Sequence, residues 1–314
     1  MRYPTPLKSG DKIAIICPST PTSRERVDKA EQAMKDLGFI PVMYPSCYAY
    51  HGHLSGPDQL RVKDINDAFS DENIQGIICL KGGSGSTRLL NDIDYDIVKK
   101  NPKVFLGYSD ITALLTVFNQ NCDLVTFHGP MASSDVFTDS ADKNYLDPYT
   151  VESFKANIMT HGFKGILKNP EGETFKTLVA GSCEGLLCGG NLSLLTATLG
   201  SPYEIDTKGK ILFMEEVNES NYNVDKMLTA LALAGKFHDC AGIILGTFSH
   251  CEPELKQSYG GHDLTLETIF DEVLAKYQKP ILANLRAGHN FPQPTLAMGA
   301  LVRLDSEKQI IEFI

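Results

Sequence analysis

Val104-Phe-Leu-Gly-Tyr-Ser-Asp-Ile-Thr-Ala-Leu-Leu115 is the most informative segment of this chain of 314 residues. Its apolar first half predicts a buried strand ending at Gly107, and the helical spacing of Ile111 and Leu114 predicts a helix after it. Ser109 therefore falls in a tight strand-to-helix turn, where backbone N–H groups and the helix dipole can face a developing oxyanion. That position suits a serine nucleophile. An ordinary N-cap serine is the alternative, and Ile111 stands where a G-x-S-x-G motif has its second glycine.

Strand and helix signals alternate over the first part of the chain. We expect strands at 12–17, 39–44, 74–80, 104–106 and 124–127, and helices at 23–37 and 59–69. Repeated strand–helix units with continuously apolar strands are typical of a parallel sheet covered on both faces. Because such sheets bind ligands at the carboxyl ends of their strands, Ser109 and the glycine-rich segment 81–88 are expected on one rim.

The glycine-rich segment, Lys81-Gly-Gly-Ser-Gly-Ser-Thr-Arg88, follows a predicted strand and could cradle an anion with its backbone N–H groups. It lacks the G-x-x-x-x-G-K-[ST] pattern of a phosphate-binding loop, and Arg88 occupies the third glycine position of a dinucleotide fingerprint. Alone it is equally a tight strand-to-helix connection. Beside Ser109, small residues would let a backbone N–H approach a reacting carbonyl.

The organisation of the chain suggests two domains, which its length allows. We expect an α/β nucleophile domain at 1–132, a polar linker or inserted region at 133–177, and a C-terminal domain at 178–314. The second half has too many glycines at 181–193 for a regular helix. Further strands are expected at 210–214, 242–245, 281–285, 295–303 and 310–314, and a helix at 224–234.

Composition excludes several classes of function. The net charge is −10 and no lysine or arginine block stands out, which disfavours a nucleic-acid partner. We find no apolar run of the length of a signal peptide or membrane span, so we expect a cytoplasmic protein with no membrane partner. The eight cysteines show no C-x-x-C pair, which fits a reducing compartment, and no set of residues has metal-ligand spacing.

Six segments, in order, resemble one family: the serine L,D-carboxypeptidases, or muramoyltetrapeptide carboxypeptidases, which include the microcin C immunity peptidases. The similarity covers most of the chain. The segments are Ile16-Cys-Pro-Ser-Thr20, Gly82-Gly-Ser-Gly-Ser-Thr-Arg-Leu-Leu90 with Asp94-Tyr-Asp96, Gly107-Tyr-Ser-Asp-Ile-Thr-Ala-Leu114, Glu184-Gly-Leu-Leu-Cys-Gly-Gly-Asn-Leu192, Leu212-Phe-Met-Glu-Glu-Val-Asn-Glu219 and Gly288-His-Asn-Phe-Pro-Gln293.

The resemblance implies a Ser–Glu–His catalytic triad. It corresponds here to Ser109, His289 and a glutamate at the end of the 210–214 strand. A serine hydroxyl needs an imidazole to take its proton and a carboxylate to hold that imidazole. We prefer Glu215, with Glu216 and Glu219 as alternatives, because neighbouring residues on a strand point to opposite faces.

The resemblance also implies an oxyanion hole and a substrate site. The backbone N–H of Asp110 and one from the Gly82–Gly83 turn, assigned to Gly83, would form the oxyanion hole. Gly82, Ser84, Lys81 and Arg88 would contact substrate, with Arg88 or Lys81 binding its terminal carboxylate, although a structural salt bridge is an equal alternative. The family commonly has arginine and tyrosine where this chain has Lys81 and Ser84.

The function implied is release of the terminal D-alanine from the L,D bond of murein tetrapeptides in cell-wall recycling. The implied fold is a Rossmann-like N-terminal domain and a β-rich C-terminal domain that carries the glutamate and histidine, with the active site in the interdomain cleft. A homodimer is implied, and no metal or organic cofactor. The alternatives are a self-immunity hydrolase of peptidyl or aminoacyl nucleotides, against which the absence of tryptophan argues, and a non-catalytic muropeptide-binding protein.

Overall fold

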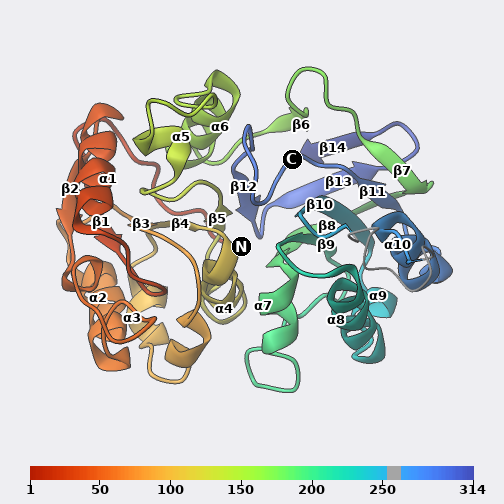
Figure 1. Cartoon of the computed structure of the whole chain (residues 1–314), viewed down its shortest axis with the longest axis horizontal. Helices are drawn as coiled ribbons and strands as arrows, with labels where there is room; N and C mark the ends of the chain where they lie inside the picture. Colours follow the sequence, from red (N-terminus) through yellow and green to blue (C-terminus); the bar gives the residue numbers. More distant parts are fainter. Residues whose placement is uncertain (253–262) are drawn as a thin grey trace. The chain divides into compact units, whose positions relative to one another are not determined.

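The computed structural model describes residues 1–252 and 263–314, and the chain divides into two compact units (Figure 1). The first contains residues 1–163 and 291–299, and the second contains residues 164–290 and 300–314. This division differs from the expected one in two places. The predicted linker at 133–177 is shared between the units, and a short segment near the C-terminus returns to the first unit.

The first unit contains, among the residues described, one sheet with the strand order β12-β5-β4-β3-β1-β2. Neighbouring strands from β1 to β5 are parallel, and β12 pairs antiparallel with β5. All residues of β3, β4 and β5 are buried, as continuously apolar strands of a doubly covered sheet should be. The strands are β1 (Lys12–Ile16), β2 (Ile40–Met43), β3 (Gly76–Cys79), β4 (Val104–Gly107), β5 (Thr126–His128) and β12 (Leu296–Met298).

The first unit has, among the described residues, six α-helices. They are α1 (Arg24–Asp36), α2 (Asp58–Ser70), α3 (Tyr95–Lys100), α4 (Thr112–Cys122), α5 (Asp135–Thr138) and α6 (Pro148–Ile158), with 3₁₀ turns η1 (Pro45–Cys47), η2 (Ser86–Leu89) and η3 (Ser109–Ile111). Helices α1, α2 and α4 contact strands of this sheet. Phe118 of α4 makes edge contacts with Phe105 of β4 and Phe69 of α2, with ring centroids 4.9 and 5.4 Å apart. This aromatic cluster fixes α4 against the strand that precedes it.

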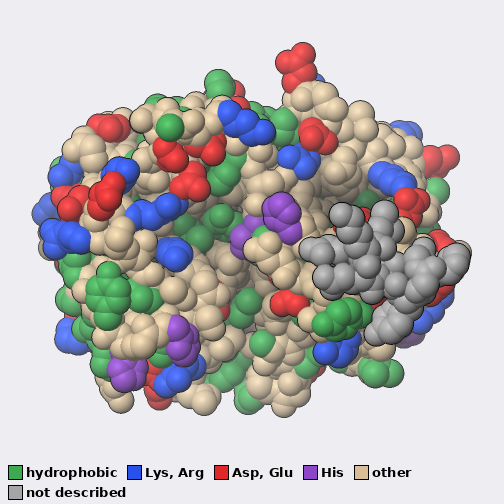
Figure 2. Space-filling model, viewed as in Figure 1, with side chains coloured by type: hydrophobic (Ala, Val, Ile, Leu, Met, Phe, Trp, Pro, Cys, Tyr) green, Lys and Arg blue, Asp and Glu red, His purple; other side chains and the backbone are tan. Residues whose placement is uncertain are grey.

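Helix α1 illustrates the solvent-facing side of the unit. Ser23 caps its first turn by accepting from the Arg26 N–H, and Val27 and Met34 lie on its buried face. Figure 2 shows positive and negative side chains interspersed over this helix. Six of its charged residues form three ion pairs at i, i+4 spacing. Such exposed pairs contribute little to stability, so the buried face determines how the helix packs.

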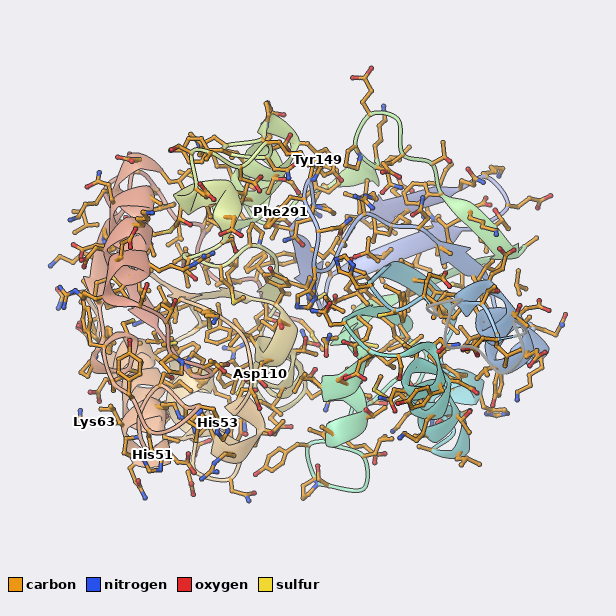
Figure 3. The ribbon with its side chains drawn as sticks, viewed as in Figure 1. His51, His53, Lys63, Asp110, Tyr149 and Phe291 are labelled. Atoms are coloured by element: carbon orange, nitrogen blue, oxygen red, sulfur yellow. The ribbon has the colours of Figure 1, made fainter. Side chains whose placement is uncertain are left out.

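A single strand was expected at 295–303, which would extend past the end of the segment 291–299 that belongs to the first unit. The structure instead breaks that strand at Gly299, whose φ is +90° and where a Cβ would lie 2.3 Å from Asn119 Nδ2. Asn119 Nδ2 donates to Met298 O, and the Gln293 N–H donates to Thr150 Oγ1 of α6, which ties the segment to the first unit. In Figure 3, Phe291 and Tyr149 lie in this same part of the unit.

The second unit contains, within the described residues, a mixed sheet with the strand order β6-β14-β13-β8-β9-β10-β11-β7. Its centre, β8 to β11, is parallel, and the outer pairs are antiparallel. The strands are β6 (Gly165–Leu167), β7 (Lys176–Val179), β8 (Ser182–Asn191), β9 (Ile211–Val217), β10 (Gly242–Ser249), β11 (Ile281–Ala283), β13 (Leu301–Asp305) and β14 (Ile310–Phe313).

Most of the glycine-rich segment 181–193 forms strand β8, and its glycines allow a close approach of neighbouring backbone. A Cβ at Gly189 would lie 1.9 Å from Phe213 O on the neighbouring β9, so only glycine allows the two backbones to approach this closely. The helices of this unit are α7 (Leu192–Ala197), α8 (Asn221–Leu233), α9 (Lys236–Asp239) and α10 (Leu266–Leu274), followed by η5 (Ala275–Tyr277). Within the described ranges, no helix of either unit is long and apolar enough to cross a membrane.

Candidate active site

Ser109 occupies a strained turn between β4 and α4. Its φ is +63°, in the left-handed region that non-glycine residues seldom adopt, which costs about 1–2 kcal/mol. Its side chain caps neither η3 nor α4, so the N-cap alternative does not describe this serine. A Cβ at Gly107 would lie 2.8 Å from Ile111 Cγ2, which explains why glycine ends the strand. The turn therefore presents Ser109 in the way that a nucleophile elbow does.

The glycine-rich segment 81–88, here called the glycine loop, packs directly against this serine. A Cβ at Gly82 would lie 2.9 Å from Ser109 Cβ and 3.1 Å from its Oγ, so a larger residue would displace the hydroxyl. Gly83 has a φ of +122°, and a Cβ there would overlap Thr20 Oγ1 at 2.2 Å. The structure thus brings together the two segments expected on one rim. Throughout the described ranges, the backbone N–H groups of Gly83 and Asp110 make no hydrogen bond. Both stay candidates for the oxyanion hole.

The two cations expected near substrate differ in their surroundings. Arg88 makes a bidentate ion pair with Asp58, at 2.8–3.1 Å, and Asp58 is also bound by Arg61. The Arg88 and Arg61 guanidinium groups hold the pKa of the Asp58 carboxyl below its usual value. Lys81, by contrast, has no carboxylate partner in the part of the chain that the structure describes. The salt-bridge alternative describes Arg88 in this structure, and Lys81 is the cation left available for an anionic ligand.

In the second unit, Glu215 contacts His289. Glu215 lies near the end of β9 with its side chain fully buried, and its Oε2 is 2.8 Å from His289 Nδ1. An Nδ1–H that donates to this carboxylate leaves the lone pair of the neutral ring on Nε2, the nitrogen that can take a proton. Glu215 Oε1 is buried without a hydrogen-bond partner among the described residues. An unsatisfied buried acceptor costs about 1–3 kcal/mol, so this carboxylate is not placed for stability alone.

The loop that carries His289 depends on a glycine. The φ of Gly288 is +137°, and a Cβ there would lie 2.5 Å from Thr247 Oγ1 and 2.8 Å from Glu215 Oε2. Thr247 also donates its N–H to Ala287 O at 2.9 Å. Glycine at this position lets the loop lie directly over β9 and β10, which holds the imidazole beside the carboxylate.

The two alternative acids have other partners. Glu216 points to the opposite face of β9 and accepts hydrogen bonds from Asn191 Nδ2 at 3.0 Å and from the Ser193 N–H and hydroxyl at 2.8 and 2.7 Å. Glu219 accepts from Asn223 Nδ2 at 2.9 Å. Of the three glutamates, Glu215 is therefore the one whose carboxylate is hydrogen-bonded to His289.

The environment of His289 raises its pKa above the ordinary value of 6.5. Burial of the ring lowers the pKa, but the hydrogen bond and negative charge of Glu215, together with the charge of Glu216, outweigh burial. A carboxylate that stabilises the imidazolium in this way makes the histidine a stronger base. This unit therefore carries an oriented proton acceptor.

Comparison with known proteins identifies the family. Residues 13–129 match the LD-carboxypeptidase N-terminal domain, and residues 184–304 match the LD-carboxypeptidase C-terminal domain. The chain belongs to the LD-carboxypeptidase family. The resemblance seen in the sequence is thus confirmed, and so is the two-domain α/β fold class expected from it. Carboxypeptidases are hydrolases of peptide bonds.

Relatives of this LD-carboxypeptidase family member include enzymes and immunity proteins. It is 36% identical to a probable murein peptide carboxypeptidase of Bacillus subtilis over 98% of this chain and 92% of that protein. It is similar to a muramoyltetrapeptide carboxypeptidase from Oxalobacter formigenes, with a TM-score of 0.80 and 28% identity over 96% and 97% of the two chains. It is also similar to the structure of the microcin C7 self-immunity protein MccF in complex with aspartyl sulfamoyl adenosine. The TM-score is 0.88, and the two chains are 26% identical over 99% of this chain and 97% of that one.

Sequence reasoning did not single out several polar residues that shape these sites. Ser19, Ser86 and Arg61 are buried beside the glycine loop, and Thr247 lies beneath the histidine loop. Ser19 and Ser86 lie within the two segments similar to the family, which was the available signal. Nothing in the pattern of Arg61 or Thr247 separates either residue from an ordinary helix or strand position.

Proposed function

We propose that this protein is a serine-type L,D-carboxypeptidase that releases the terminal D-alanine of murein tetrapeptides. The observation that carries the proposal is the buried Glu215–His289 hydrogen bond, which gives a chain with a strained Ser109 turn the base that a serine nucleophile requires. The 36% identity with a probable murein peptide carboxypeptidase supports the substrate class.

The proposed mechanism assigns one task to each residue. Ser109 Oγ attacks the scissile carbonyl while His289 Nε2 takes its proton, and the imidazolium then gives that proton to the departing D-alanine amine. Glu215 stabilises the imidazolium through its hydrogen bond to Nδ1. Water, activated by the same histidine, hydrolyses the acyl-enzyme. The N–H groups of Gly83 and Asp110 would bind the oxyanion of each tetrahedral intermediate.

A carboxypeptidase must also recognise a free carboxylate. We assign this task to Lys81, because Nε and Nη2 of the Arg88 guanidinium already donate to the Asp58 carboxylate. A lysine ammonium is a point charge without the planar fork of arginine, so it would hold the D-alanine carboxylate with less geometric selectivity. Gly82 and Ser84 would line the same region.

The proposed compartment is the cytoplasm. All eight cysteines are free, and seven of them are buried. Free thiols in such number are typical of proteins that work in a reducing compartment. Muropeptides returned to the cell interior would be the substrates there.

The second candidate function is hydrolysis of aminoacyl or peptidyl nucleotides. The structural similarity to the self-immunity protein MccF, with a TM-score of 0.88, favours it. The absence of tryptophan removes the strongest stacking side chain for an adenine, which argues against it.

The experiment that tests these candidates is mass spectrometry of the purified protein after incubation with the tetrapeptide L-Ala-γ-D-Glu-L-Lys-D-Ala or its diaminopimelate analogue. The Ser109→Ala variant is the control. Tripeptide and D-alanine from the wild type alone would support both the reaction and the nucleophile. Intact tetrapeptide in both samples, with cleavage of an aspartyl sulfamoyl adenosine analogue, would favour the second candidate. Cleavage by both proteins would remove Ser109 from the mechanism.

A further inference from the structure

The carboxylate of Asp110, the residue after the proposed nucleophile, lies inside the first unit in η3, the turn that precedes α4 (Figure 3). Asp110 is 3% exposed. One of its oxygens, Oδ2, accepts two hydrogen bonds, from Ser19 Oγ at 2.5 Å and from the Ser86 N–H at 2.9 Å. Ser19 and Ser86 are themselves fully buried. The carboxylate therefore joins three loops that follow β1, β3 and β4.

These bonds hold the glycine loop from its far end. Ser86 directly follows Gly85, and its hydroxyl donates to Asp110 O at 2.5 Å, so two groups of Ser86 are fixed to one residue. A second bond fixes the middle of the loop, because Oγ1 of Thr20, the neighbour of Ser19, accepts from the Ser84 N–H at 3.0 Å. The residues that directly follow Gly83 are thus fixed at two points, Ser84 and Ser86.

A buried arginine strengthens the same arrangement. Arg61 Nη1 donates to Gly85 O at 3.0 Å and to Pro18 O, and its exposed fraction is 1%. Ser55 Oγ donates to Ser19 O at 2.8 Å. The glycine loop and the loop after β1 are therefore connected to each other as well as to Asp110, and neither can shift without breaking several buried hydrogen bonds.

We propose that the Asp110 side chain is a positioning residue, which holds the glycine loop against Ser109 and so sets the distance between the nucleophile and the loop N–H of the oxyanion hole. This inference rests on the proposed serine mechanism. A shift of about 1 Å in such a group can cost on the order of 10²-fold in rate. The structural basis is the contact between Gly82 and Ser109, which leaves no room for the loop to move inward.

The role assigned to Asp110 depends on its acceptor and not on its charge. A negative charge beside a developing oxyanion opposes catalysis, whereas a hydrogen-bond acceptor at the position of Oδ2 is neutral in that respect. Because both side-chain hydrogen bonds use Oδ2, an asparagine can place its single carbonyl oxygen there and keep both donors satisfied. The conservative variant Asp110→Asn should therefore preserve the function that Asp110→Ala removes.

The test measures the rate at which a fluorophosphonate probe labels Ser109. In this reaction the Ser109 Oγ–phosphorus bond forms, the phosphorus–fluorine bond breaks, fluoride leaves, and the serine proton passes to the base. The P–O group occupies the oxyanion position, so the rate reports the geometry of the site without assuming a natural substrate. Asp64→Ala is the matched control, because Asp64 is equally buried and holds the Ser46 N–H at 2.7 Å, away from the glycine loop.

We expect Asp110→Ala to lower the labelling rate by about 10²-fold, and Asp110→Asn to stay within a few-fold of the wild type. Asp64→Ala should keep a near wild-type rate despite lowering the melting temperature. Equal rates for Asp110→Ala and the wild type would overturn the inference alone, as would an equal loss in Asp110→Asn. A wild type that is not labelled at Ser109 would overturn the proposed nucleophile, and the inference with it.

Smaller variants keep the test decisive where Asp110→Ala does not fold. Ser19→Ala removes the hydroxyl that donates to the Asp110 carboxylate, and Ser86→Ala removes the hydroxyl that donates to Asp110 O while its N–H keeps the bond to Oδ2. Each variant should slow labelling by several-fold. The double variant should slow it further while remaining folded by circular dichroism. Unchanged labelling in the folded double variant would contradict the role assigned to this network.

Discussion

The Ser109 turn and the Glu215–His289 pair differ in how they are built. Ser109 is positioned by backbone geometry within a dozen residues of sequence: a buried strand, a glycine, a left-handed residue and a helix. The Glu215–His289 pair joins residues 74 positions apart, and its geometry depends on a glycine that lets one loop lie over two strands. A local conformation sets the position of Ser109, whereas long-range packing sets the position of His289. The two regions should therefore respond to mutation in different ways.

The largest effect should come from removing the base. His289→Ala is expected to lower kcat for tetrapeptide cleavage by about 10⁴–10⁶-fold, because the proposed mechanism then lacks the group that takes the serine proton. Steady-state kinetics by mass spectrometry would measure this loss. His238→Ala is the control, since His238 is an exposed histidine of the same unit. Equal activity of the two variants would contradict the role of His289.

Glu215→Gln should cost somewhat less, on the order of 10³–10⁴-fold in kcat, because the amide can still accept from Nδ1–H but cannot stabilise the imidazolium by charge. Glu219→Gln, which alters an acid bonded to Asn223, should be nearly silent. A larger loss of kcat in Glu219→Gln than in Glu215→Gln would mean that Glu215 is not the triad acid.

Gly288→Ala should lower kcat by about 10²-fold through displacement of the histidine loop. The added Cβ would overlap Thr247 Oγ1 and Glu215 Oε2, at a φ that alanine seldom adopts. Gly200→Ala provides the comparison, because Gly200 also has a positive φ, of +76°, but open space around its Cβ position. If both alanine variants lose activity equally, backbone strain alone explains the result.

The pH dependence should report the histidine. Because the base must be neutral to accept the serine proton, kcat/KM should fall tenfold per pH unit below the pKa of His289, and that pKa is raised. The acid limb should therefore lie above the ordinary value of 6.5 and move to lower pH in Glu215→Gln. If the acid limb does not move in this variant, it does not report the protonation of His289.

The smallest expected effect is a change in the free energy of unfolding, at the Ser109 turn. Ser109→Gly should abolish cleavage yet raise the free energy of unfolding by about 1 kcal/mol, because glycine adopts a φ of +63° without strain. Ser109→Ala, which keeps the strain, should leave stability near that of the wild type. Chemical denaturation would compare them. Equal stability of the two variants would mean that the turn stores no strain.

The difference between the two regions also explains what the sequence could reveal. The Ser109 turn follows from local periodicity, since the strand, the glycine and the helix are all visible within 104–115. Strand alternation predicted that only one of Glu215 and Glu216 could face a histidine, but the identity of that residue depends on packing from β10 and the loop after β11. The end of β12 at Gly299 was missed because the residues on either side of this glycine, 296–298 and 300–302, are apolar, and the positive φ of Gly299 and its contact with Asn119 depend on the folded structure.

The central claim is that Ser109 and His289 act as one catalytic unit. Double-mutant kinetics test it most directly: residual tetrapeptide hydrolysis is measured for Ser109→Ala, His289→Ala and the variant that combines both. Residues that act together give strongly non-additive losses, so we predict that the double variant is no slower than Ser109→Ala alone. If the loss of rate in the double variant equals the product of the two single losses, the two residues act independently, and the account is contradicted.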